Sequence, residues 1–345
     1  MNFEDLEQLV RPNIARLCPY STARDDYKGS LGVFLDANES PYQNGFNRYP
    51  DPHQKALKAR LSEIKGISGE NIFIGNGSDE AIDLVFRVFC TPGKDNIVAI
   101  APSYGMYEVA AATNDIEVRK VQLSAPDYSL DCGKLLAAAD SNTKAIFLCT
   151  PNNPTGNAFP NRQVLDICAR FGGIVVVDEA YIDFCVIPSL RSKVDEIPNL
   201  IVLQTLSKAW GMAGLRLGLA FACRRIIGLM SMIKYPYNIN QLAQETVLRQ
   251  LDFPIDAHVA EIREQREAVS QMLAAMPFVK KVYPSQANFV LVKVDDADAL
   301  YGHLIEDGII VRNRTRVPGC EGCLRITVGT PEENVKLGKS LQSYA

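Results

Sequence analysis

Short apolar runs recur along the first two thirds of the chain, and each one ends in a polar or Gly/Pro-rich turn. The clearest runs cover residues 96–102, 144–151, 173–181, 199–208 and 215–223. Helix-like stretches such as residues 162–171 lie between several of them. Strands that are apolar on both faces and alternate with helices predict a mostly parallel sheet covered by helices on both sides. We therefore expect an α/β fold over about residues 50–250.

The pattern changes toward the C-terminus. Residues 256–277 combine charged positions with an apolar stripe, which predicts one long amphipathic helix. A strand over 287–294, a helix near 297–307 and strands over 308–314 and 323–329 are expected to follow. This order predicts a smaller α+β domain.

The chain has 345 residues, more than one hydrophobic core usually organises, so two domains are expected. We interpret residues 1–45 as an N-terminal arm and part of the small domain. Residues 46–250 would form the large domain, and residues 251–345 the C-terminal small domain.

Composition and charge are those of an ordinary globular protein, with 47% hydrophobic and 22% charged residues. The formal net charge of −4 argues against nucleic acid or an anionic membrane as the main partner. The sequence contains no run of roughly 18 apolar residues, which excludes an ordinary membrane-spanning helix. The N-terminus resembles no secretory signal, and the nine cysteines scattered through apolar runs indicate reduced core residues. We expect a cytoplasmic protein.

Cys320 and Cys323 have the spacing of a metal-binding pair. No second pair lies nearby in the sequence, and His303 is the only histidine in this region. We therefore expect two ordinary thiols and no metal site.

Lys208 follows a buried strand, in the region where parallel sheets bind ligands. Thr205 and Ser207 precede it, and Arg216 comes eight residues later. Apolar surroundings and a nearby cation both favour the neutral, nucleophilic amine. The hydroxyls and the guanidinium are donors suited to a phosphate. A solvated lysine is the ordinary alternative, but this combination favours a reactive amine.

Asp178 ends another apolar run, and Tyr181 follows three positions later. A carboxylate at such a strand end needs a cationic partner, because otherwise its pKa rises. Magnesium at a nucleotide site is one candidate, but the sequence lacks a glycine-rich phosphate loop ending in Gly-Lys-Ser/Thr. A protonated pyridine nitrogen fits the remaining residues better.

Three further strand ends carry candidate ligand-binding residues. Asn153 lies in an Asn-Pro-Thr-Gly turn and can donate to a phenolate or carboxylate oxygen. Gly77, Ser78 and Asp79 lead into a predicted helix whose N-terminal amides suit a phosphate, although such residues are often simple N-caps. Tyr104 can stack on a flat ring or merely pack.

In this order, the motifs resemble those of fold-type I pyridoxal-phosphate aminotransferases. The resemblance covers about residues 12–330 and narrows to the histidinol-phosphate aminotransferase family. The segments that carry it are LDANESPY (35–42), NRYPDP (47–52), GNGSDEAID, PSYGMYEV, TPNNPTGN, TLSKAWGMAGLRLG and GCLRITVGT. It implies a homodimer with pyridoxal 5′-phosphate as cofactor. The implied reaction, a step of histidine biosynthesis, converts L-histidinol phosphate and 2-oxoglutarate into imidazole-acetol phosphate and L-glutamate.

The resemblance also implies roles for the cofactor site. Lys208 would form a Schiff base with the cofactor and carry a proton, and Asp178 would pair with the ring nitrogen. Tyr181 and Asn153 would bind the ring's 3′-oxygen, and Tyr104 would stack on the ring. The cofactor loop and its phosphate ligands would be Gly77, Ser78, Asp79, Thr205, Ser207 and Arg216, with Tyr49 from the neighbouring subunit.

For the substrate, the resemblance implies that Arg325 binds a carboxylate and that Arg312 is its additional partner for a phosphorylated substrate. Asn153 would contact the substrate as well, and Tyr20 would help to close the site. Tyr237 is a further candidate pocket residue from the other subunit.

Several alternatives share these motifs. Threonine-phosphate decarboxylase needs the same cofactor site and paired arginines, and an aromatic-amino-acid aminotransferase is a third choice. A non-catalytic relative would carry an added DNA-binding domain or lack the lysine. Lys208 is present and we identify no appended domain, so an enzyme is expected.

Overall fold

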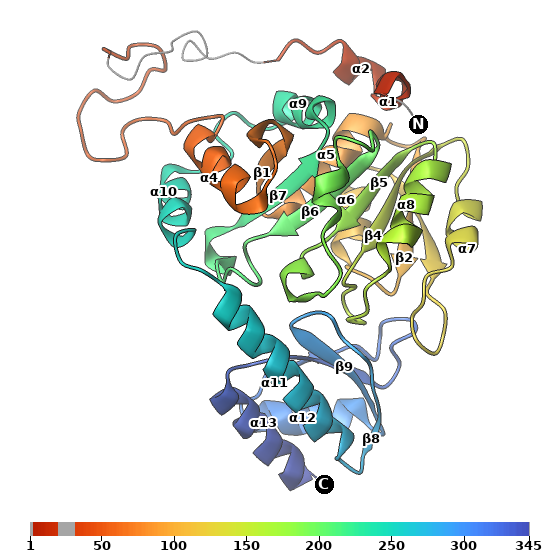
Figure 1. Ribbon diagram of the computed structural model, residues 1–345. Coiled ribbons are helices and arrows are strands. Elements are labelled where there is room, and N and C mark those ends of the chain that lie inside the picture. Colours follow the sequence, from red (N-terminus) through yellow and green to blue (C-terminus); the bar gives the residue numbers. More distant parts are fainter. Residues whose placement is uncertain (1–2, 20–31, 345) are drawn as a thin grey trace.

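The computed structural model describes residues 3–19 and 32–344 of the chain. Two domains lie one above the other in Figure 1, and the long helix α11 (Asp256–Ala274) begins near the larger one and runs along the smaller one. Within the described ranges, no helix combines the length and the apolar character needed to cross a bilayer.

In the described part of the chain, the large domain is built on a seven-stranded sheet with the order β1-β7-β6-β5-β4-β2-β3. The pairs among β2 to β6 are parallel, whereas β7 runs antiparallel to both of its neighbours, β1 and β6. The mostly parallel sheet expected from the sequence is therefore confirmed. The strands are β1 (Ile72–Asn76), β2 (Asn96–Ala101), β3 (Glu117–Gln122), β4 (Thr143–Cys149), β5 (Ile174–Asp178), β6 (Leu200–Thr205) and β7 (Leu217–Ala222).

Helices cover both faces of this sheet. Alternate residues of each strand point to opposite faces and therefore belong to different hydrophobic cores. Ile72 and Ile74 of β1 belong to one core, and Phe73 between them belongs to the other. The first core is closed by α4 (Lys55–Lys65), α7 (Cys132–Ala137), α8 (Asn161–Arg170) and α10 (Gln241–Gln250). The second is closed by α5 (Ser78–Phe89), α6 (Met106–Thr113) and α9 (Arg224–Ile233). Short 3₁₀ helices complete the domain: η1 (Gly69–Asn71), η2 (Ile182–Phe184), η3 (Leu190–Lys193) and η4 (Ala213–Leu215).

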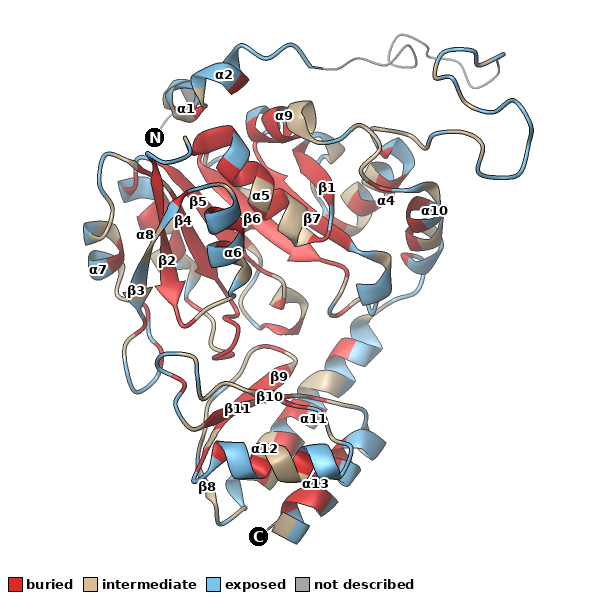
Figure 2. Ribbon diagram, turned by 180° about the vertical axis from the view of Figure 1, so that it is seen from behind, coloured by how far each residue is buried: buried red, intermediate tan, exposed pale blue. Residues whose placement is uncertain are grey.

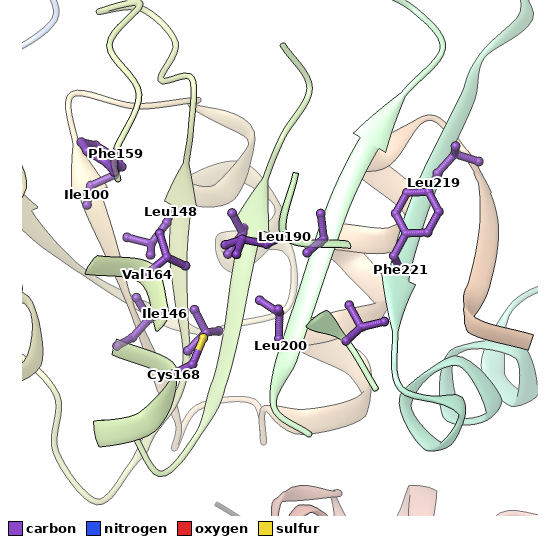
Figure 3. Close-up of a cluster of buried hydrophobic side chains, with 14 of the residues drawn as sticks. Ile100, Ile146, Leu148, Phe159, Val164, Cys168, Leu190, Leu200, Leu219 and Phe221 are labelled. Carbon is purple, nitrogen blue, oxygen red and sulfur yellow. The ribbon is translucent and has the colours of Figure 1, made fainter. Parts of the chain in front are cut away.

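Figure 3 shows the first core from close by. Val164 and Cys168 of α8 lie against Ile146 and Leu148 of β4, and Phe221 of β7 marks the far side of the same layer. The strands that make up this layer are red, hence buried, along almost their whole length in Figure 2. Burial on both faces explains why the sequence of these strands is continuously apolar rather than alternating.

The N-terminal helices α1 (Phe3–Leu9) and α2 (Pro12–Ala15) lie on the large domain. Leu6, Val10 and Ile14 are buried in its second core. The interpretation that residues 1–45 contribute to the small domain is therefore wrong for this segment, because its apolar side chains are buried against α5 and α9 side chains instead.

The small domain has a four-stranded antiparallel sheet with the order β10-β11-β9-β8. Its strands are β8 (Val279–Val282), β9 (Phe289–Val294), β10 (Arg312–Asn313) and β11 (Cys323–Thr327). Helices α11, α12 (Ala297–Glu306) and α13 (Pro331–Tyr344) pack on it. The sequence interpretation missed β8, whose segment Val-Lys-Lys-Val has little apolar signal, and α13. We propose residues 46–250 and 251–345 as the two domains.

A small hydrophobic cluster joins the two domains. Tyr181 and Ala209 of the large domain meet Val259 and Phe289 of the small domain in it. The rings of Tyr181 and Phe289 are perpendicular, with their centroids 5.1 Å apart. This junction lies directly beside the carboxyl ends of β5 and β6, where the candidate site is found.

Candidate active site

A cavity of about 150 Å³ opens at the carboxyl ends of the parallel strands. Eleven of the residues singled out from the sequence line it, although they come from segments far apart in the chain. They are Gly77, Ser78, Asp79, Tyr104, Asn153, Asp178, Tyr181, Thr205, Ser207, Lys208 and Arg216. These segments adjoin the ends of neighbouring strands at one edge of the sheet, so their side chains come together there.

One end of the cavity is suited to an anion. Helix α5 begins here, directly after Gly77, and no side chain caps its N-terminus. Gly77 has a φ of +77°, and a Cβ on it would lie 2.8 Å from the Arg216 guanidinium. The Arg216 guanidinium lies 3.6 Å from the Asp79 carboxylate. Uncapped amides, the positive end of the helix dipole and a guanidinium together form a phosphate-sized cradle.

Gly218 of β7 packs closely against the start of α5. A Cβ at this position would lie 2.0 Å from the backbone nitrogen of Ser78, so no other residue fits without moving the start of α5. The amide of Gly77 also donates to the carbonyl oxygen of Arg216 at 2.7 Å. The pairing of β1 with β7 thus holds the two halves of the cradle together.

The other end of the cavity holds a buried carboxylate. Asp178 is the last residue of β5, and its Oδ2 accepts a hydrogen bond from the Tyr107 hydroxyl at 2.7 Å. Its Oδ1 accepts from the amide of Ala180 at 3.0 Å. Burial raises the pKa of Asp178, and the two donors oppose this effect only in part. A cation placed beside this carboxylate would restore its charged form.

Lys208 lines the same cavity from the loop that follows β6. Its Nζ is 5.6 Å from the centre of the Tyr181 ring and is accessible through the cavity. Neighbouring atoms nevertheless remove much of its water, which lowers the pKa of Lys208, and Arg325 and Arg216 lower it further. Asp178 acts in the opposite direction. The net lowering of the pKa makes it easier for Lys208 to reach its neutral form, which is the nucleophile and the proton acceptor.

Arg325 of β11 reaches the cavity from the small domain. Its Nη1 donates to Oδ1 of Asn153 at 2.5 Å, and its guanidinium lies 5.2 Å from the centre of the Phe289 ring. Burial lowers the pKa of Arg325. A cation is therefore held next to Asn153 and Tyr181, two residues that line the cavity.

Two expected site residues, Arg312 and Tyr49, lie outside the lining of this cavity. Arg312 is exposed on β10, directly across the ladder from Arg325. Tyr49 does not line the Lys208 cavity; it lies in a separate groove, where its ring stacks on Tyr237 at 4.3 Å. Tyr20 lies outside the described residues.

Sequence reasoning missed two residues of the site. Tyr107 is completely buried and binds Asp178 from behind, and Cys149 lines the cavity. Tyr107 follows Tyr104 by three positions, and the two rings meet edge to face at 5.6 Å. A tyrosine in an apolar helix has the same sequence signal whether it only packs or also positions a carboxylate.

Comparison with known proteins agrees with this geometry. Residues 26–340 match the family model of aminotransferase class I and II. The chain is 54% identical to a histidinol-phosphate aminotransferase of Parabacteroides distasonis over 342 residues, which cover 99% of both chains.

Solved structures show the same fold. The histidinol-phosphate aminotransferase of Sinorhizobium meliloti in complex with pyridoxal-5′-phosphate has a TM-score of 0.77 at 24% identity, covering 86% of this chain and 84% of that one. The L-threonine-O-3-phosphate decarboxylase of Porphyromonas gingivalis has a TM-score of 0.71 at 24% identity, covering 86% and 90%. The expected fold-type I architecture is confirmed. This chain belongs to the class I and II aminotransferases and, within them, to the family of histidinol-phosphate aminotransferases.

Proposed function

We propose that the protein transfers the amino group of L-histidinol phosphate to 2-oxoglutarate, giving imidazole-acetol phosphate and L-glutamate in histidine biosynthesis. The observation that carries this proposal is that one cavity is lined by Lys208, by the uncapped start of α5 with Arg216, and by the buried carboxylate of Asp178. The full-length identity of 54% to a histidinol-phosphate aminotransferase supports the choice of substrate.

Pyridoxal 5′-phosphate fits the residues present. Its phosphate would be held by the amides of Gly77 and Ser78 and by Arg216, with Thr205 and Ser207 beside them. Asp178, whose pKa burial raises, would gain the cation that it lacks. When bound, this cofactor supplies an aldehyde that condenses with amines and a charged ring that withdraws electrons from the substrate.

Each nearby side chain then has a defined task. The Lys208 amine, with its lowered pKa, accepts the proton from the substrate carbon and returns it to the product. Asp178 keeps the ring nitrogen protonated. Tyr181 and Asn153 orient the ring's oxygen, and Tyr104 covers one face of the ring. Tyr107 holds Asp178 in position through the 2.7 Å hydrogen bond.

For substrate binding we propose Arg325 and Arg312. The two residues are direct partners across the antiparallel β10–β11 pair, so their side chains leave the same face of the sheet. Two guanidiniums on one face suit the oxygens of a phosphate or a carboxylate. Tyr20 remains a proposed substrate contact.

An assay with purified, cofactor-loaded protein tests the function. We expect glutamate to form when L-histidinol phosphate and 2-oxoglutarate are supplied together, and to be absent when either is omitted. Threonine phosphate should release no carbon dioxide, and phenylalanine should react more slowly than histidinol phosphate. Release of carbon dioxide from threonine phosphate without transamination of histidinol phosphate would select the decarboxylase, which shares the fold at a TM-score of 0.71.

We also propose that the protein works as a homodimer. The segment over residues 32–46 exposes several large apolar side chains, including Val33 (87%), Leu35 (86%) and Phe46 (64%). With Tyr49 and Tyr237 it borders a groove of about 790 Å³. In Figure 1 this segment extends away from the large domain. Exposed apolar area of this kind favours burial against a second subunit.

Mixing two inactive variants tests the dimer. Lys208→Ala retains Tyr49, and Tyr49→Ala retains Lys208, so a mixed dimer has one site with both native residues. After subunit exchange, activity should rise to about one quarter of the wild-type value, because random pairing makes half of the dimers mixed. The assay should use too little cofactor to load Tyr49→Ala alone. If the activity of the mixture only equals the sum of the activities of the two unmixed variants, Tyr49 acts in the site of its own subunit or in no site.

We propose a cytoplasmic location for the protein. None of the nine cysteines forms a disulfide, and seven of them are buried. Unpaired cysteines are typical of proteins from reducing compartments.

A further inference from the structure

A third arginine lies beside Arg312 and Arg325. Arg314 directly follows β10, and its backbone amide donates to the carbonyl oxygen of Cys323 at 2.8 Å, which continues the β10–β11 ladder by one pair. Because side chains alternate along a strand, Arg314 leaves the same face as Arg312. On the partner strand it is diagonal to Arg325, a distance that long side chains span.

In the part of the chain that the structure describes, these three guanidiniums have no carboxylate partner. Among residues 3–19 and 32–344, no ion pair involves Arg312, Arg314 or Arg325. The hydrogen bond of the Arg325 guanidinium goes to Asn153, a neutral amide. The Nε atoms of Arg314 and Arg325 are buried without any hydrogen-bond partner. Half-buried cations without counterions are costly, so such an arrangement indicates a place for an anion.

Electrostatics agrees with this geometry. The pKa of Arg314 is lowered first by burial and then by the nearby charges of Arg325 and Arg312. Tyr181, which lines the Lys208 cavity, is close enough to both Arg314 and Arg325 to affect their pKa values. Two members of the arginine cluster (Arg312, Arg314 and Arg325) therefore lie near residues that line the cavity: Arg325 near Asn153 and Arg314 near Tyr181.

We propose that Arg314 is a third anion-binding residue of the substrate site and makes this site selective for a doubly charged phosphate monoester over singly charged groups. The inference deepens the proposed function and rests on it. One bidentate guanidinium satisfies the two oxygens of a carboxylate. A phosphate monoester has three terminal oxygens and two charges, which three arginines match.

A purely structural Arg314 would behave differently. Its replacement would lower the stability of the protein, or weaken every ligand by a similar factor. A charge-selective Arg314 would instead weaken a dianion more than a monoanion of the same shape. The ratio of two affinities therefore separates the two roles.

Phenyl phosphate and phenyl sulfate supply this comparison, because at pH 8 the first carries two charges and the second carries one. Each is titrated by calorimetry into cofactor-loaded wild type, Arg314→Gln and Arg316→Gln. Loading the cofactor fills the cradle at Gly77 and Ser78, so that the titration reports on the arginine cluster. Arg316 is exposed and two residues further along, which makes it the matched control.

We expect the wild type to prefer phenyl phosphate. Arg314→Gln should weaken phenyl phosphate by about tenfold to a hundredfold, the range of one charge-assisted hydrogen bond, and phenyl sulfate much less. Arg316→Gln should retain the wild-type ratio. Equal weakening of both ligands by Arg314→Gln, or no weakening, overturns the inference.

The outcome is independent of the proposed reaction. If the wild type does not transaminate histidinol phosphate but Arg314→Gln still abolishes the preference for phenyl phosphate, the proposed function fails and the anion selectivity stands. If the enzyme transaminates histidinol phosphate and the preference survives in Arg314→Gln, the function stands and Arg314 has no selective role.

Discussion

Replacing Lys208 with alanine is expected to lower the turnover of histidinol phosphate by at least about 10⁴-fold, because one side chain serves as both nucleophile and proton carrier. Lys208 lines the same cavity as the phosphate cradle and Asp178, and its lowered pKa suits both tasks. The variant should still bind pyridoxal phosphate, since the cradle and Asp178 remain. Steady-state rates, together with the visible absorbance of the bound cofactor, measure the two effects.

Two comparisons make this result specific. Lys134→Ala, which removes a lysine that is 72% exposed on α7, should react at the wild-type rate. Borohydride should fix the cofactor to the peptide that contains residue 208 in the wild type and not in Lys208→Ala. Turnover of Lys208→Ala close to that of the wild type, or labelling of another lysine, would remove the basis of the proposed function.

Asp178→Asn is expected to have the second largest effect. Removing one partner of a buried charge pair costs about 3–5 kcal/mol. If that loss appears in the transition state, kcat/KM falls by about 10²–10⁴-fold. Asparagine has nearly the same shape, but it cannot keep a ring nitrogen protonated. Kinetics with histidinol phosphate measure the loss.

The stability of Asp178→Asn distinguishes this role from a simple folding defect. Without cofactor, Asp178 is a buried acid whose pKa is raised, so the uncharged amide should leave the melting temperature unchanged or higher. The increase in melting temperature on adding cofactor should be smaller than in the wild type. Tyr107→Phe, which removes only the 2.7 Å hydrogen bond, should cost about tenfold in rate. An Asp178→Asn enzyme with wild-type kcat/KM would exclude the ring-nitrogen role.

Much of the fold could be predicted from the sequence because the central strands are continuous apolar runs, such as Ile174–Val177. The direction of β7 could not, since a strand buried on both faces reads the same whether it is parallel or antiparallel. The position of α1 could not either, because a short amphipathic helix does not reveal which core it joins.

The candidate site shows the same division. Lys208, Asp178 and Asn153 could be expected to meet, because each follows a strand of one parallel sheet. Tyr107 could not be recognised, since only its burial against Asp178 distinguishes it from a packing residue. Arg314 and Arg316 also read alike in the sequence. In the structure, Arg314 differs from Arg316 because it is partly buried and lies near Arg325. Both properties arise only in the folded chain.

The β1–β7 pair has a consequence for how the protein matures. Gly77 and Arg216 come from distant parts of the chain, and this antiparallel pair brings them together. During synthesis, a growing polypeptide that ends before Gly218 therefore lacks a complete binding site for the phosphate of the cofactor. This holds even if its earlier strands have already formed. The cofactor can thus bind only after β1 and β7 have paired. This long-range pairing takes longer to form than local contacts.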